Sequence, residues 1–292
     1  MRITAWPTGF SRSNRVLRLG LLLGVVGATA ALQPAAAQEP AGLMANAKGY
    51  TAVKVSGEPQ EGLGAMTALS NRVFKPAGAG PGPLPAVVLV HTCGGVLNAH
   101  IRQHAQELLA AGYVVLVQDS HGPRNFVTCR EKAIPFAVGV MDAYAGLTSL
   151  AALPLVDKQR IYLAGYSYGG FAAAMASSPQ SAATFASPLR FRAAVAHYAS
   201  CTRPSGAQVV LRDIDKPLLM LMGERDTEAL PATCFPLLEQ LKAGGAPVEW
   251  HVYPGATHGW DKPGETANGY VYREETALDA TRRMLAFFDA HK

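Results

Sequence analysis

The sequence predicts an α/β fold in which helices cover both faces of a mostly parallel, doubly wound sheet. Three observations support this prediction: short aliphatic runs, stretches with helical periodicity between them, and a regular alternation of the two along the chain. Runs that are apolar on both faces are typical of parallel strands, because helices bury both sides of such a sheet. Ligands of these sheets bind at the carboxyl ends of the strands, where we expect the functional residues.

The expected elements follow one another through the last three quarters of the chain. The first strand, over residues 66–75, is expected in a hairpin, and a loop rich in glycine and proline follows it. The later strands are expected at residues 86–90, 114–118, 161–164, 193–197, 218–222 and 248–253. The helices are expected at residues 98–111, 132–152, 168–177, 231–243 and 274–290.

The first 37 residues have the order of a secretory signal peptide. A basic stretch precedes an apolar run over residues 19–32, and three alanines at 35–37 follow it. The run is too short to span a bilayer comfortably, since a transmembrane helix needs about 20 apolar residues. We therefore expect cleavage after Ala37, a periplasmic or secreted protein without a stable membrane anchor, and one domain over residues 38–292. An uncleaved N-terminal anchor is the alternative.

The net charge of the chain belongs to this leader. The chain contains 26 Lys and Arg against 21 Asp and Glu, and residues 1–37 hold four of the arginines and no acid. The mature chain therefore has 22 basic against 21 acidic residues. No basic stripe remains, which argues against a nucleic acid as partner. The remaining length suits one α/β domain with a substantial buried core.

A glycine-flanked serine follows one of the predicted strands. The motif GYSYGG occupies residues 165–170, after the expected strand and at the start of a predicted helix. In this context G-x-S-x-G is typical of a nucleophile elbow, in which small residues on either side of the serine let the backbone turn sharply. The helix N-terminus favours developing negative charge. The pattern predicts Ser167 as a nucleophile; an ordinary serine in a glycine-rich turn is the alternative.

A serine hydroxyl needs an oriented base, and two later loops supply candidates. In elbow-type hydrolases the partners follow the serine in the order acid, then histidine. Asp226 comes in the loop after the strand at 218–222, and His258 comes in the loop after the strand at 248–253. Both loops are expected at the same edge of the sheet as Ser167. The sequence therefore predicts Ser167, Asp226 and His258 as a catalytic triad.

Five other titratable residues near these loops are weaker candidates. Glu224 shares the loop of the predicted acid and remains an alternative to it. His251 is disfavoured because it lies inside a strand, and Asp261 because it follows His258 too closely to orient it. Asp213 and Asp215 are disfavoured because they precede their strand and so lie at the opposite edge of the sheet.

The loop HTCGG follows the expected strand at 86–90 and supplies backbone donors at the same edge. An oxyanion hole in this type of site uses the N–H of the residue after the nucleophile and one N–H from an early loop. We expect these donors to be Tyr168 and Cys93, with Thr92 or Gly94 as alternatives for the second. No metal site is expected, because the loop has no second closely spaced pair of ligands nearby.

These motifs together resemble the dienelactone hydrolase-like family of α/β-hydrolases over essentially the whole mature chain. The motifs that carry the resemblance are HTCGG, the loop DSHGPRN after a strand, GYSYGG, GERD and ATHGW. The resemblance implies an α/β-hydrolase fold of about eight strands, esterase or lactonase activity on a small molecule, no cofactor and no large lid. Dienelactone hydrolase itself has a cysteine nucleophile where this chain has Ser167, so the resemblance extends to acyl transfer rather than to the dienelactone substrate.

The four cysteines are expected to form disulfides, because an even count in an exported chain favours them over free thiols. Four cysteines allow three pairings. Cys93 and Cys129 follow successive predicted strands, and so do Cys201 and Cys234. We therefore predict the pairs 93–129 and 201–234, which would clamp loops of the active site.

Several residues at the active edge are expected to contact substrate. Arg124, in the loop after the strand at 114–118, could hold a carboxylate by a two-pronged hydrogen bond, with a structural ion pair as the alternative. Tyr166 and Trp260 are expected to border the pocket, together with Phe126.

The sequence therefore predicts an exported serine hydrolase that cleaves carboxylic ester or lactone bonds through an acyl-enzyme on Ser167. Two alternatives remain. One is a small serine peptidase, because GYSYGG is also similar to the elbow of prolyl-oligopeptidase-type peptidases. The other is a secreted binding protein that keeps the fold without catalysis, although the complete set of serine, aspartate and histidine argues against it.

Overall fold

The computed structural model describes residues 44–292, apart from 56, 81, 204–205, 207 and 265–268. The predicted signal peptide, residues 1–37, lies outside the described residues. Within the described part, no helix combines the length and the apolar character needed to cross a membrane.

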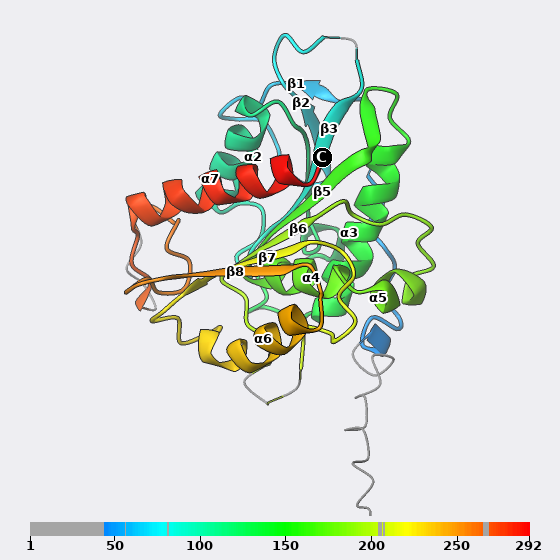
Figure 1. Ribbon diagram of the computed structural model, residues 1–292. Coiled ribbons are helices and arrows are strands. Elements are labelled where there is room, and N and C mark those ends of the chain that lie inside the picture. Colours follow the sequence, from blue (N-terminus) through cyan, green and yellow to red (C-terminus); the bar gives the residue numbers. More distant parts are fainter. Residues whose placement is uncertain (1–43, 56, 81, 204–205, 207, 265–268) are drawn as a thin grey trace, which may run out of the picture. The chain divides into compact units, whose positions relative to one another are not determined.

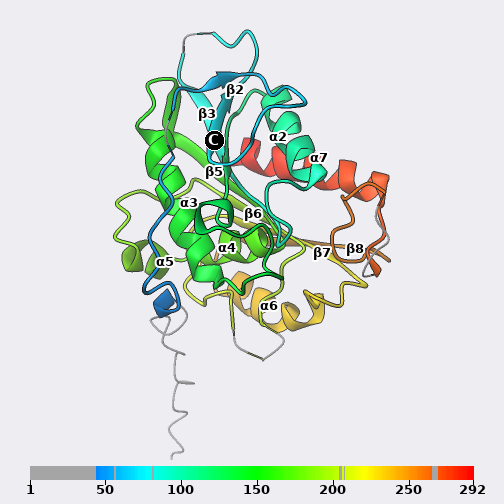
Figure 2. The ribbon, with the colours of Figure 1, turned by 180° about the vertical axis from the view of Figure 1, so that it is seen from behind.

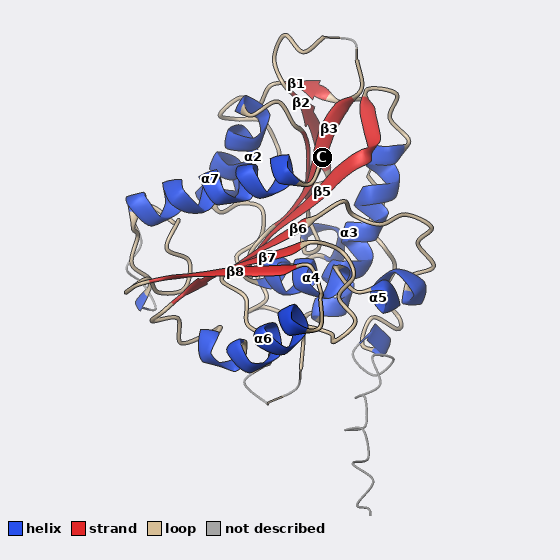
Figure 3. Ribbon diagram, in the orientation of Figure 1, coloured by secondary structure: helices blue, strands red, loops and turns tan. Residues whose placement is uncertain are grey.

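The described residues form an eight-stranded sheet, which Figure 3 shows in red. Its spatial order is β1-β2-β4-β3-β5-β6-β7-β8. All neighbouring strands are parallel except β2 and β4, which are antiparallel. The strands are β1 (Gln60–Glu61), β2 (Arg72–Lys75), β3 (Leu84–Val90), β4 (Val114–Gln118), β5 (Val156–Tyr166), β6 (Ala194–His197), β7 (Leu218–Gly223) and β8 (Val248–Tyr253). The predicted mostly parallel sheet is confirmed.

Helices cover both faces of this sheet (Figures 1 and 2). One face packs against α2 (Ala99–Ala110) and α7 (Glu274–Ala290), and the other against α3 (Phe136–Ala151), α4 (Tyr168–Ala176) and α6 (Phe235–Ala243). The central strands are mostly apolar where they lie between the two layers of helices, because they serve both cores; residues 157–160 of β5 are polar and not buried. In β3, for example, Val88 and Val90 face the α3 side, whereas Val87 and Leu89 face the α2 side.

The prediction of a first strand over residues 66–75 is wrong over most of its length. Only Arg72–Lys75 is extended, since Met66 is 97% exposed and Asn71 has a φ of 52°. A left-handed residue interrupts a strand. The strand also forms no hairpin with the next one in sequence, because β2 pairs with β4.

The other differences from the predictions concern short elements and the ends of longer ones; β5, for example, begins at Val156 rather than at residue 161. Neither β1 nor the six-residue helix α5 (Pro179–Thr184) was expected. Helix α3 begins later than predicted because Pro135 stands at its N-cap. The helix predicted at 231–243 is divided into a 3₁₀ turn, η2 (Pro231–Thr233), and α6.

Both predicted disulfides are present. Cys93 pairs with Cys129, with 5.1 Å between their Cα atoms, and Cys201 pairs with Cys234 at 4.8 Å. The second bond is fully buried and ties the segment after β6 to the start of α6.

Replacing Cys201 and Cys234 together by alanine removes a cross-link between residues 33 positions apart. We expect the free energy of unfolding to fall by about 2–4 kcal/mol, because the bond restricts the unfolded chain. Urea unfolding of the wild type and the double variant measures the change. Equal midpoints in the two proteins would contradict the prediction.

Candidate active site

Ser167 stands on a strained turn between β5 and α4. Its φ of 50° and ψ of −109° lie outside the regions that side-chain-bearing residues favour, at a cost of about 1–3 kcal/mol. The turn is held from neighbouring segments, since the Ser167 N–H donates to the His197 carbonyl at 3.0 Å. A side chain at Gly165 would lie 1.9 Å from the Gly169 carbonyl oxygen, so the turn requires glycine there. These contacts are the local features that the GYSYGG motif encodes.

The three residues predicted as a triad are brought together in one hydrogen-bonded line. Ser167 Oγ lies 2.8 Å from His258 Nε2, and His258 Nδ1 lies 2.8 Å from Asp226 Oδ2. The other oxygen of Asp226 accepts from the N–H groups of Glu228 and Ala229, at 2.9 and 2.7 Å. Because a carboxylate only accepts, Nδ1 of His258 carries the proton and Nε2 presents its lone pair to the serine hydroxyl. This geometry is suited to deprotonating the hydroxyl.

The rival candidates lie elsewhere. Glu224 accepts from the Gly255 N–H, and Asp261 pairs with His104 rather than with His258. The remaining three have other surroundings: His251 packs on Tyr253 within β8, Asp213 accepts from Ser178, and Asp215 pairs with Arg190.

A cavity with two lobes surrounds the serine and the histidine. The lobes have volumes of about 350 and 210 Å³ and share Cys93, Ser167, Glu228 and His258. Polar side chains line much of the larger lobe, including Asn98, His100, Arg130, Lys262 and Tyr270. The smaller lobe is more apolar and is lined by the Cys93–Cys129 disulfide, Tyr168, Phe136, Phe171 and Arg203, with the two phenylalanine rings stacked 4.3 Å apart.

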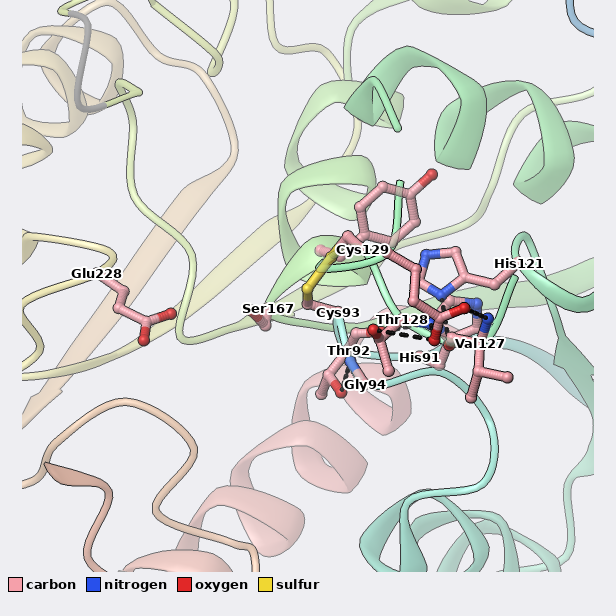
Figure 4. Close-up of a disulfide and its surroundings, with 12 residues drawn as sticks. His91, Thr92, Cys93, Gly94, His121, Val127, Thr128, Cys129, Ser167 and Glu228 are labelled. Atoms are coloured by element: carbon pink, nitrogen blue, oxygen red, sulfur yellow. Dashed lines mark hydrogen bonds between the residues drawn. A yellow bond between two sulfur atoms is a disulfide. The ribbon is translucent and has the colours of Figure 1, made fainter. Parts of the chain in front are cut away.

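The oxyanion candidates both border this cavity. Cys93 belongs to the loop after β3, and Tyr168 opens α4 directly after the serine. The two segments are joined by a hydrogen bond from the Gly169 N–H to the His91 carbonyl, at 3.0 Å. Figure 4 shows the Cys93–Cys129 disulfide and Ser167 in this region.

Two residues of the site, Glu228 and Tyr270, were not predicted from the sequence. Glu228 Oε2 lies 3.7 Å from His258 Nε2, and the Tyr270 hydroxyl donates to the other oxygen of Glu228 at 2.5 Å. The position of Glu228, two residues after the predicted acid, was the available indication. Nothing in the local sequence around Tyr270 indicates its place, because it reaches the site from the stretch between β8 and α7.

Three aromatic residues that were predicted to border the pocket lie away from it. Tyr166 and Trp260 are fully buried and do not line the cavity. Tyr166 ends β5 with its side chain on the α2 face, where its ring stacks between His104 and His197. Trp260 packs there against Tyr198. The alternation of side chains along β5 decides the direction of Tyr166, although the next residue is the predicted nucleophile. Phe126 is also buried away from the cavity, against His121.

Arg124 does not contact the cavity either. Its guanidinium forms a two-pronged ion pair with Asp142, with N–O distances of 2.8 and 2.9 Å, and donates to the carbonyls of Ser120 and Thr51. The Asp142 side chain is fully buried. The structural ion pair is therefore correct, and the carboxylate-binding role is wrong.

Replacing Arg124 by methionine leaves the buried Asp142 without its cation. We expect the free energy of unfolding to fall by about 3–5 kcal/mol, because an uncompensated buried charge is costly. The KM for ester substrates should not change. Arg130→Met is the matched control, since Arg130 is exposed at the cavity and its loss should leave stability unchanged. A tenfold rise in KM at full stability for Arg124→Met would contradict this assignment.

Three buried histidines lie beside the cavity, and one of them, His100, lines it. His104 donates to Asp261 at 2.9 Å and to Glu107 at 3.1 Å. Burial opposes a charge on the ring, but these hydrogen bonds outweigh it and raise the pKa of His104 to about 9. Burial lowers the pKa of His100 to about 4 and that of His197 to about 3. The group therefore holds one imidazolium and two neutral rings at neutral pH.

The raised pKa of His104 predicts how stability depends on alkaline pH. Below about pH 6.5 both the folded and the unfolded chain bind this proton, whereas between about 6.5 and 9 only the folded chain does. Stability should therefore fall as pH rises through that range. Urea unfolding at pH 6, 7.5 and 9 should show a steeper fall for the wild type than for His104→Gln. Parallel curves would contradict the prediction.

The architecture and the surroundings of Ser167 define the class of the protein. A mostly parallel eight-stranded sheet, with a serine on a strained turn after a central strand, is the α/β-hydrolase fold. Residues 69–292 match the dienelactone hydrolase family, so the chain belongs to that family and is a hydrolase. Among the described residues, no group of three or more His, Cys, Asp or Glu side chains is arranged to hold a metal ion.

Relatives and solved structures agree with this assignment. A Salmonella typhimurium protein named "Putative carboxymethylenebutenolidase" is 26% identical over 230 residues, which cover 72% of this chain and 78% of that protein. The dienelactone hydrolase-like promiscuous phosphotriesterase P91, from metagenomic libraries, is 19% identical with a TM-score of 0.55 and covers 72% of this chain and 87% of its own. Esterase 2 of Thermogutta terrifontis, with propionate bound, is 18% identical with a TM-score of 0.54 and covers 75% and 88%. The last two show the shared fold.

Proposed function

We propose that the protein is an exported serine hydrolase that cleaves carboxylic ester or lactone bonds through an acyl-enzyme on Ser167. The observation that carries this proposal is the line of hydrogen bonds from Asp226 through His258 to Ser167, with 2.8 Å at both steps. A nucleophile, a base and an orienting acid in contact are the requirements of two-step acyl transfer.

In the first step, His258 Nε2 takes the hydroxyl proton as Ser167 Oγ attacks the carbonyl carbon. The carbonyl π electrons move to oxygen, where the N–H groups of Cys93 and Tyr168 would stabilise the oxyanion. When the intermediate collapses, the C–O bond to the alcohol breaks and His258 returns the proton to the alkoxide. The buried carboxylate of Asp226 stabilises the imidazolium that forms between these events.

In the second step, water replaces the alcohol. His258 takes a proton from water as the oxygen attacks the acyl carbon, and collapse of this second intermediate returns the proton to Ser167 Oγ. The products are a carboxylic acid and an alcohol, which remain in one hydroxy acid when the substrate is a lactone. No step requires a group beyond the side chains, the backbone N–H groups and water.

The family assignment and the cavity support esters or lactones as substrates. The name carboxymethylenebutenolidase, carried by the Salmonella typhimurium relative, describes a lactone hydrolase. A cavity with lobes of about 350 and 210 Å³ suits a small molecule. The apolar side chains of the smaller lobe favour a substrate with one apolar portion.

Export is supported by the leader and the disulfides. The basic stretch, the apolar run and the alanines of residues 1–37 have the order of a cleavable signal, and disulfides persist in oxidising compartments. N-terminal sequencing of protein recovered from the producing bacterium's periplasm or medium tests this part. We expect the mature chain to begin at Gln38. A mature chain that still begins at Met1, recovered from the cytosol, would contradict it.

Ser167→Ala tests the catalytic assignment. With short-chain p-nitrophenyl esters, we expect kcat to fall by at least about 10⁴-fold, because the triad acts as a unit. A fluorophosphonate probe should label the wild type and leave the folded variant unlabelled. Equal labelling of the two proteins would contradict Ser167 as the nucleophile.

The ester and probe assays, together with turnover of peptide anilides, distinguish the proposed function from the two alternatives. Peptide anilides turned over faster than esters would favour a peptidase. A folded wild type that neither reacts with the probe nor turns over any ester would favour a binding protein.

A further inference from the structure

His91 is a buried titratable residue that the proposed mechanism does not use. It follows β3 directly, is fully buried and packs against the rings of His121 and Tyr168, with centroid distances of 4.4 and 5.8 Å. Figure 4 shows it near Thr92 and Cys93, on the loop of the expected oxyanion donor. The contacts of His91 can therefore affect the conformation of that loop.

Two hydrogen bonds determine which nitrogen of His91 carries the proton. The backbone N–H of Ser120 donates to Nε2 at 3.0 Å, so Nε2 must present a lone pair. In a neutral ring the proton is then on Nδ1, which lies 2.6 Å from the Thr92 carbonyl oxygen and donates to it. Burial, followed by the nearby His121, lowers the pKa of His91 to about 4, which keeps the ring neutral at neutral pH.

The acceptor of this bond belongs to the peptide that carries the expected donor. The Thr92 carbonyl and the Cys93 N–H lie in one peptide plane, and in a trans peptide they point in opposite directions. Holding the carbonyl against His91 therefore fixes the direction of the Cys93 N–H. The Gly95 N–H also donates to this carbonyl, at 3.0 Å, so two donors hold it.

The main chain of the same residue joins the two halves of the expected oxyanion hole. The His91 carbonyl accepts from the Gly169 N–H, next to Tyr168. On the far side, Cys93 is held by its disulfide and by the Cys129 N–H, which donates to the Cys93 carbonyl at 3.0 Å. The position of the Cys93 residue is thus secured by Cys129, whereas the orientation of its own N–H depends on the carbonyl before it.

We propose that His91 is a positioning residue for the reaction: its Nδ1–H holds the Thr92–Cys93 peptide so that the Cys93 N–H is directed at the substrate oxyanion. This inference rests on the proposed function. It assigns to a buried side chain outside the triad a part of the stabilisation of the tetrahedral intermediate.

Substitution of His91 by asparagine or by glutamine distinguishes the role of Nδ1 from that of Nε2. The side-chain nitrogen of asparagine takes the place of Nδ1 and can still donate to Thr92, whereas the side chain of glutamine reaches the place of Nε2 and can accept only from Ser120. We expect His91→Asn to keep kcat within about threefold of the wild type and His91→Gln to lower it about 10- to 100-fold. That loss is below the full effect of deleting an oxyanion donor because Gly95 still holds the carbonyl.

The decisive readout is an inhibitor that forms an oxyanion. A trifluoromethyl ketone adds reversibly to the serine and places an alkoxide in the oxyanion hole. Its inhibition constant should rise in His91→Gln in proportion to the loss of kcat, with KM unchanged within about threefold. A role limited to packing predicts the opposite order, because glutamine fills the space of the ring better than asparagine does.

Leu108→Ala is the matched control, since it removes buried volume from α2 without touching the loop. It should lower the melting temperature and leave the inhibition constant unchanged. If His91→Gln does not fold, the folded His91→Asn variant is tested instead. A hundredfold loss of kcat in His91→Asn overturns the proposal. Equal inhibition constants in the wild type and folded His91→Gln also overturn it. A wild type without esterase activity or probe labelling would instead refute the proposed function.

Discussion

The constraint on which the rest of the site depends is the left-handed backbone of Ser167. A residue with a side chain adopts this conformation only when its surroundings impose it. Here the His197 carbonyl holds the serine N–H, and the absence of a side chain at Gly165 lets β5 double back into α4. The absence of a side chain at Gly169 lets α4 approach the Val90 carbonyl at the end of β3. The turn projects the hydroxyl beyond the sheet edge, within 2.8 Å of His258. Every other part of the site is arranged around that fixed oxygen.

Different interactions hold the two loops around this oxygen in place. The acid loop is held by two backbone N–H groups on Asp226, and the loop after β3 is held by the Cys93–Cys129 disulfide and the ring of His91. A covalent bond and directional hydrogen bonds leave these groups little freedom, so the site is largely organised before substrate binds. Such preorganisation lowers the cost of stabilising charge in the transition state.

Behind the cavity, a buried charge connects the loop of His258 to helix α2. Asp261, three residues after His258, is hydrogen-bonded to the protonated ring of His104 and to the hydroxyl of Tyr198. Tyr198 in turn packs edge-on against the ring of His258, with 5.1 Å between the centroids. The His104 imidazolium therefore holds the segment after His258 directly, through Asp261, and reaches the His258 ring itself only through Tyr198.

The layers of the fold, the order of the central strands along the chain and the three residues that we propose as a triad were predictable from the sequence. Strands apolar on both faces are periodic signals, and a nucleophile elbow is a local motif whose partners follow in a known order. The disulfide pairing was also predictable, because the cysteines of each pair follow successive strands. The tertiary structure alone decided which neighbours of these residues face the cavity. Tyr166 points into the opposite core because side chains alternate along β5, Arg124 is taken by Asp142 from helix α3, and Tyr270 arrives from a distant stretch of chain. These outcomes depend on packing between segments far apart in sequence, which no local pattern records.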